Sequence, residues 1–122
     1  MQNPDATTAE SSPPIPLHLV RKACTSLAEY LPGEIRHWQD FLAAVDQVRR
    51  WLGISADTWA DATAQMGPCN AAIVTACILQ RSDHIASPGA YLRTLTRKSV
   101  TGSFTPGPMV MALLNQPSRQ AA

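Results

Sequence analysis

Apolar residues recur every three or four positions along most of the chain, and this spacing predicts helices. The periodic stretches define six helical segments, at residues 17–31, 37–52, 56–66, 70–81, 88–100 and 109–114. No run of four or more residues alternates between apolar and polar, so nothing in the pattern predicts a sheet. The sequence therefore predicts an all-α fold, a compact bundle of about six short helices.

The segment at 70–81 differs from the others because it has no polar face. Residues 71–79 are apolar throughout, with Thr75 as the exception. A helix that is apolar all round has to be buried all round. We therefore expect this segment to form the central, buried helix. Cys77 lies within it, and both Cys77 and Cys24 are expected to pack as small buried hydrophobic residues.

Short polar residues mark several expected helix starts. The signals are Ser55, Ser87-Pro88 and Thr105-Pro106. A serine or threonine hydroxyl can accept a free amide of the first turn, and proline suits the first helical position because its missing N–H has no partner there. The pair Gly67-Pro68 is interpreted as a break between the third and fourth segments.

The ends of the chain look different from its middle. Residues 1–16 are rich in Ser, Thr, Ala and Pro, which predicts a disordered, flexible N-terminal tail or linker. Residues 17–116 are expected to form one helical domain, and residues 117–122 a second flexible tail. The longest apolar stretch is far below the roughly 20 residues that a membrane span needs, and no signal-peptide pattern is present. We therefore expect a cytoplasmic protein that makes no membrane contact.

The residues that most often carry chemistry are few and scattered. They are His18, His37, His84, Cys24, Cys69 and Cys77. No histidine has a cysteine or carboxylate at metal-ligand spacing, and the cysteine gaps fit neither a disulfide framework nor a metal knuckle. A glycine-rich phosphate loop and a G-x-S-x-G elbow are also missing. The sequence predicts a protein that is not an enzyme and uses no metal, cofactor or small-molecule substrate.

Charge is distributed unevenly, although the net charge is only +1. Residues 1–66 carry a net charge of −3, and residues 67–122 carry +4. Such asymmetry points weakly towards an anionic partner on one side of the molecule. The candidate nucleic-acid-binding residues are Arg81, Arg93, Arg97 and Lys98.

The last three of these bases lie in the segment at 88–100, which contains no acid. Arg93 and Arg97 are one turn apart and share a face, while Leu92, Leu95 and Ser99 are expected to face the core. One interpretation is a helix whose arginines grip phosphates. The alternative is that bases in the last turns simply complement the negative end of the helix dipole. The spacing leaves both open.

Three large apolar residues are candidates for an interaction surface: Trp51, Met109 and Met111. Trp51 follows Arg49-Arg50, so a partner contact stands beside core packing as an interpretation. Methionine adapts to varied partners, and docking of the last helix onto its own core is the alternative. The sequence does not decide between these readings.

Several motifs occur in a characteristic order between residues 16 and 115. They are residues 38–44 (WQDFLAA), 52–55 (LGIS) with Trp59, 66–68 (MGP), 71–81 (AAIVTACILQR), 84–93 (HIASPGAYLR), 102–104 (GSF) and 107–114 (GPMVMALL). In this order they resemble the C-terminal region of RepC, the replication initiator of alphaproteobacterial repABC-type plasmids and secondary replicons. The Ser-Pro-x-x-Tyr-Leu-Arg element is also similar to a helix of DnaD-type replication modules.

The resemblance implies a role in starting replication at a plasmid origin. In that family the main origin-binding, winged-helix region lies in the N-terminal half, and no catalytic motif falls in the part that resembles this chain. Relatives tend to have an acidic residue after the Tyr-Leu-Arg element, where this chain has Ser99-Val100.

Two functions follow as hypotheses. The first is a plasmid replication initiator module that contacts replication proteins or associates with itself. The second is an accessory DNA-binding domain, whose basic helix at 87–100 contacts plasmid origin DNA. A free-standing regulator unrelated to replication remains a third, because likeness of fold alone does not fix function.

Overall fold

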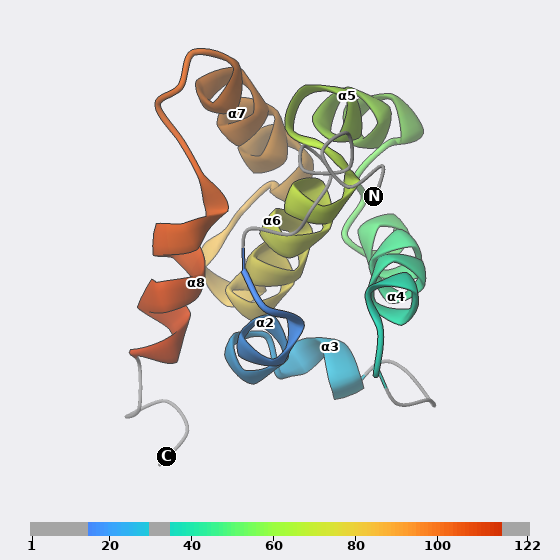
Figure 1. Ribbon diagram of the computed structural model, residues 1–122. Coiled ribbons are helices and arrows are strands. Elements are labelled where there is room, and N and C mark those ends of the chain that lie inside the picture. The colour runs from blue at the N-terminus through green and yellow to red at the C-terminus, as the bar shows by residue number, and fades with distance from the viewer. Residues whose placement is uncertain (1–14, 30–34, 116–122) are drawn as a thin grey trace, which may run out of the picture.

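The computed structural model describes residues 15–29 and 35–115 of the chain (Figure 1). Within these residues it contains α-helices and one short 3-10 helix, and no strand. The α-helices are α2 (Leu17–Ala23), α3 (Ser26–Glu29), α4 (Trp38–Trp51), α5 (Ala56–Met66), α6 (Pro68–Gln80), α7 (Pro88–Val100) and α8 (Pro106–Leu114). The 3-10 helix η1 covers Ser82–His84. The predicted all-α bundle is confirmed.

Helix α6 runs through the middle of the bundle, with the other helices arranged around it (Figure 1). It packs against α3, α4, α5, α7 and α8. Every residue from Ala71 to Leu79 is buried, as a helix without a polar face requires. The expected central helix is therefore confirmed, and it holds the core together.

The first predicted segment is divided into two helices in the structure. Helix α2 ends at Ala23, because Cys24 has φ −110° and ψ 63°. The break is tied to the end of α6. Ser26 N–H donates to Gln80 Oε1 at 2.7 Å, and Gln80 Nε2 donates to Thr25 Oγ1 at 3.4 Å. Since the partner is 54 residues away, the local apolar spacing could not reveal this break. The predicted end of the segment, at residues 30 and 31, lies outside the described residues.

Two of the expected N-caps are formed. Ser55 Oγ accepts a hydrogen bond from Thr58 N–H at 3.2 Å, and Ser87 Oγ accepts one from Ala90 N–H at 3.3 Å. Both hydroxyls thereby satisfy an amide that has no partner within its helix.

Two helices begin earlier than their apolar periodicity predicts. Helix α6 begins at Pro68 and α8 at Pro106, so each has proline at its first position. Gly67-Pro68 is therefore a helix start as well as a break. Thr105 precedes α8, but its side chain makes no capping hydrogen bond.

The packed region begins slightly before the expected domain start. Ile15 is buried and belongs to the core, two residues ahead of Leu17. Residues 1–14 and 116–122 lie outside the described residues, so the flexible tails expected there stay predictions.

Cys24 and Cys77 are both buried, as predicted, and they lie in contact inside the core. Their Sγ atoms are 3.8 Å apart, and both residues are buried. The hydrogen bond with the Cys77 thiol, together with burial, raises the pKa of the Cys24 thiol well above its ordinary value. Cys24 therefore stays protonated and packs as an apolar residue.

Two buried threonines provide a matched test of hydroxyl satisfaction. Thr75 Oγ1 has no hydrogen-bond partner among the described residues, whereas Thr96 Oγ1 donates to the Leu92 carbonyl at 2.8 Å. We expect Thr75→Val to raise the free energy of unfolding by about 1 kcal/mol, because it removes an unsatisfied buried hydroxyl. Thr96→Val should leave it unchanged or lower it. Urea denaturation followed by circular dichroism measures both, and equal effects would contradict the assignment.

Candidate functional site

Helix α7 has its orientation fixed by the residues that it buries. Leu92, Leu95 and Thr96 face the core, where α7 packs against α5 and α6. Ser99, which was expected to face inwards with Leu92 and Leu95, is half-buried. The remaining surface of α7 is therefore open to solvent.

The predicted basic residues do not form one patch. Arg93, Arg97 and Lys98 are all exposed on α7, and Arg93 and Arg97 lie one turn apart on the same face. Lys98 is rotated by about 100° from Arg97. It follows Leu95 by three positions and thus flanks a different side of the helix. Arg81 caps the end of α6 and is half-buried.

No carboxylate neutralises these cations in the described part of the chain. Between described residues, ion pairs join Asp46 to Arg49 and Arg50, on α4. The sequence also has no aspartate or glutamate from residue 84 to residue 115. Helices α7 and α8 therefore carry positive charges and no negative one.

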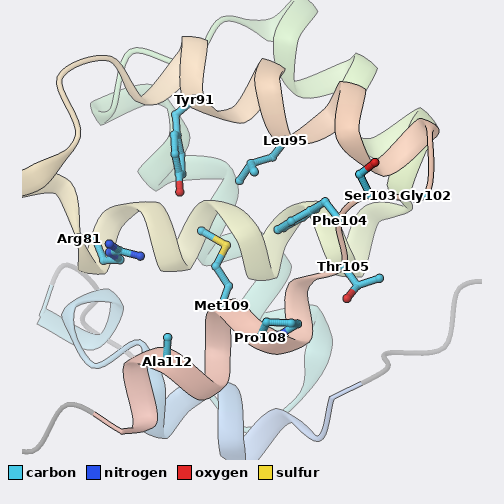
Figure 2. A pocket seen from close by; sticks show the side chains of 10 residues that line it. All are labelled: Arg81, Tyr91, Leu95, Gly102, Ser103, Phe104, Thr105, Pro108, Met109 and Ala112. Carbon is cyan, nitrogen blue, oxygen red and sulfur yellow. The ribbon is translucent and has the colours of Figure 1, made fainter.

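An open groove of about 510 Å³ lies between α7 and α8. Tyr91 and Leu95 of α7 form one wall, and Pro108, Met109 and Ala112 of α8 form the other. Figure 2 shows these side chains facing one another across the groove. Apolar periodicity could not predict that the two helices share a groove, because it reports which face of a helix is apolar and not which faces meet.

Two further residues close the ends of this groove. Phe104, in the turn between α7 and α8, points into the space between the helices (Figure 2). At the other end the Arg81 side chain lies near Tyr91 (Figure 2). The groove thus combines an apolar lining with a cation at one end.

The two methionines proposed for an interaction surface have different environments. Met111 is 50% exposed, but Met109 is only 9% exposed and belongs to the core. Met109 is therefore docked onto its own core, which was the alternative interpretation, and an interface role for Met111 stays a prediction. Positions two apart on a helix point about 200° from each other, so only one of them can face outwards. Met111 does not line the groove, but it lies one turn along α8 from Pro108, which does.

Trp51 is exposed, but at a different place. Its side chain is 57% exposed at the C-terminal end of α4. Helix α4 packs against α6 and α3, and Trp51 does not line the groove. Trp51 is therefore exposed away from the groove, and its role as an interaction residue stays a prediction.

The described residues contain no group of three or more His, Cys, Asp or Glu side chains that could hold a metal ion. In the same part of the chain, every helix is too short or too polar to cross a membrane. The features that stand out are thus the groove and the exposed cations.

The groove depends on a well-formed start of α7, which the Ser87 cap provides. We expect Ser87→Ala to lower the free energy of unfolding by about 1 kcal/mol, because the Ala90 amide loses its partner. Thermal or urea denaturation measures the change. Ser82→Ala serves as the control, since Ser82 is exposed and starts only the short η1. A Ser87→Ala protein as stable as wild type would contradict the capping role.

Comparison with known proteins gives a consistent family. The family model described as the C-terminal region of replication protein C matches residues 16–116. A protein of Rhizobium rhizogenes named "Putative replication protein C" is 46% identical over 111 residues, which is 90% of this chain. One of Sinorhizobium fredii with the same name is 48% identical over 100 residues, or 81% of this chain.

The chain spans 27% and 25% of the lengths of these two relatives. No solved structure matches it significantly. Because the family model covers almost the whole described region and the relatives are similar over most of the chain, the chain belongs to the replication protein C family, as a C-terminal region of that family.

Proposed function

We propose that this chain acts in plasmid replication initiation, as the C-terminal module of an initiator, by contacting other proteins. The partners are replication proteins or a second copy of the initiator. The family match and the names of the two relatives support the replication role. Since the chain spans about a quarter of each relative, the module supplies one part of the initiator's work.

The groove between α7 and α8 is the observation that supports the proposed contact with other proteins. Its walls expose apolar groups of Tyr91, Pro108 and Ala112 to solvent, and the half-exposed Met111 extends this surface. Exposed apolar surface with a polar rim is typical of protein interaction sites. Aromatic residues and methionine are also enriched at such sites.

Filling the groove should disable the module without unfolding it. Ala112 lines the groove and is exposed on α8, so Ala112→Tyr can be accommodated by the helix while its ring occupies the groove. In a plasmid whose replication depends on this gene, we expect about a tenfold or larger drop in transformants, because interface energy concentrates in a few central contacts.

Ala64→Tyr is the matched control, because Ala64 is an exposed alanine on α5 and lies outside the groove. It should replicate as wild type. Immunoblotting checks that both proteins accumulate equally. Wild-type replication of the Ala112→Tyr plasmid would remove the groove from the proposed function.

A second candidate function is accessory DNA binding by α7. The observation that favours it is the pair Arg93 and Arg97, which are exposed, lie one turn apart on α7 and are not ion-paired with a described carboxylate. If they bind phosphates, the log–log salt slope of origin-DNA binding should become shallower by roughly 2 in Arg93→Ala/Arg97→Ala, about one for each lost contact.

Fluorescence anisotropy with labelled origin DNA measures this slope. Arg21→Ala/Lys22→Ala is the control, because it removes two exposed charges from the end of α2. Its salt slope should match wild type. Absence of DNA binding at about 50 mM salt, where electrostatic binding is strong, would reject this second function.

A further inference from the structure

The groove has one cation in its lining and a second beside it. Arg81 lines the end near Tyr91, as Figure 2 shows. Lys98 does not line the groove, but it is exposed and follows Tyr91 by seven positions and Leu95 by three, which places it on the groove side of α7. The middle of the lining is apolar and contains Leu95 and Met109. The groove therefore offers apolar surface with a positive charge at one end and a second positive charge on the α7 rim.

We propose that the groove binds a short acidic segment of another protein, with large apolar side chains placed between its carboxylates. This inference rests on the proposed protein-contact function and names the chemistry of the partner. The charge argument has two parts. Neither Arg81 nor Lys98 is ion-paired with a described carboxylate. Residues 84–115, which contain Lys98 and both helices of the groove, include no acid, and the acid nearest to Arg81 in the sequence is the exposed Asp83. An acidic partner supplies the missing counter-charges.

The half-burial of Arg81 strengthens its preference for a carboxylate. A guanidinium that is partly shielded from water interacts more strongly with an anion than a fully solvated one does. Its planar fork also fits a carboxylate through two parallel hydrogen bonds. Arg81 thus makes the specific contact with a carboxylate of the segment, and the more exposed Lys98 makes a weaker and less specific contact.

The spacing along α7 sets the length of the segment. Arg81 lies near Tyr91 (Figure 2), and the seven residues of helix from Tyr91 to Lys98 cover about 10 Å along the axis of α7. An extended peptide covers this distance in about three residues. The segment therefore has its acidic residues about three positions apart, with one or two apolar residues between them over Leu95 and Met109.

Nucleic acid fits these features less well. A phosphate backbone needs cations at regular intervals, and the middle of the groove is lined by aliphatic and thioether groups that donate no hydrogen bonds. The exposed pair Arg93 and Arg97, on another side of α7, is the better phosphate site. An acidic peptide and DNA are thus expected to depend on different residues.

The test uses the full chain and a fluorescein-labelled hexapeptide, Glu-Asp-Leu-Phe-Asp-Glu. Fluorescence anisotropy should show saturable binding. Arg81→Gln/Lys98→Gln should weaken it by about tenfold or more, because both charge contacts are lost. The matched control is Arg93→Gln/Arg97→Gln, which removes the same charge from another side of α7 and should change the affinity by less than about twofold. Equal losses in the two variants would mean unspecific charge attraction and would overturn the proposal.

A second pair of variants tests the groove without changing Arg81, so a structural effect of the Arg81 substitution cannot explain the result. Ala112→Glu places a negative charge in the groove wall and should weaken binding of the hexapeptide. Ala112→Gln introduces a side chain of nearly the same volume as glutamate but without the charge, so it should bind the hexapeptide more tightly than Ala112→Glu does. A control peptide with Ser-Ser in place of Leu-Phe should not bind. Equal binding of the two peptides, or of the two Ala112 variants, would overturn the groove as the site.

The outcome for the peptide is separable from that for the proposed function. If Ala112→Tyr blocks plasmid replication but the hexapeptide does not bind, the contact function stands and the acidic chemistry is wrong. If the hexapeptide binds as described but Ala112→Tyr replicates normally, the groove chemistry stands and its role in replication is wrong. Displacement of the hexapeptide by double-stranded DNA of equal charge concentration would favour nucleic acid as the occupant and overturn the proposal.

Discussion

Replacing Ile73 by alanine is expected to lower the free energy of unfolding by about 3–4 kcal/mol. Ile73 is fully buried in α6, which is enclosed by five other helices. Neighbours held on several sides cannot collapse into the space left behind, so the lost packing adds to the lost transfer energy. Urea denaturation followed by far-UV circular dichroism measures the change, and two-state behaviour is checked by an unchanged slope.

Val100→Ala is the control for this experiment. Val100 is also an aliphatic helix residue, but its side chain is 60% exposed at the end of α7. We expect a change within about 0.5 kcal/mol, as is usual for surface positions. Similar losses in the two variants would contradict the assignment of α6 as the centre of the core. Because small domains are stable by roughly 5–15 kcal/mol, the Ile73 change alone removes a large share of the stability.

The second large effect is expected at the junction between α5 and α6. Gly67 has φ +89° and ψ 152°, a conformation that is almost confined to glycine. A Cβ at this position would meet nothing within 4 Å, so the cost of Gly67→Ala is conformational and not steric. We expect a loss of about 2 kcal/mol in the free energy of unfolding. Thermal and urea denaturation both measure it.

Gly89→Ala should have the opposite sign. Gly89 lies in the first turn of α7, has no positive φ, and a Cβ there would make only ordinary van der Waals contacts, at 3.8 Å and 4.0 Å. Alanine is favoured over glycine in a helix by roughly 0.5–1 kcal/mol, so this variant should be more stable than wild type. If both glycine variants change stability in the same direction, the conformational argument at Gly67 is wrong.

Features determined by neighbours in the sequence could be predicted. The apolar run at 71–79 identified the central helix because its burial depends on its own composition. Ser55 and Ser87 identified helix starts because a cap bonds an amide three positions away. The exposure of Arg93 and Arg97 followed in the same way from their position opposite Leu92 and Leu95.

Features determined by distant contacts could not be predicted. The break after Ala23 depends on Gln80, which belongs to another helix. The groove depends on how α7 and α8 face each other across the turn that contains Phe104. The outcome for Met109 and Met111 had a local cause, a rotation of about 200°, but which of the two faces inwards depends on the packing partner of α8.

The contact between α2 and α8 joins the first and last described helices (Figure 1). During synthesis α2 leaves the ribosome long before α8 exists, so its apolar side has to wait for a partner that is made almost last. Completion of the domain is thus coupled to the end of this stretch of translation. A nascent or prematurely terminated chain would lack Val110 and Leu113, which are buried in the native protein. Its exposed apolar surface would be recognised by chaperones and proteases.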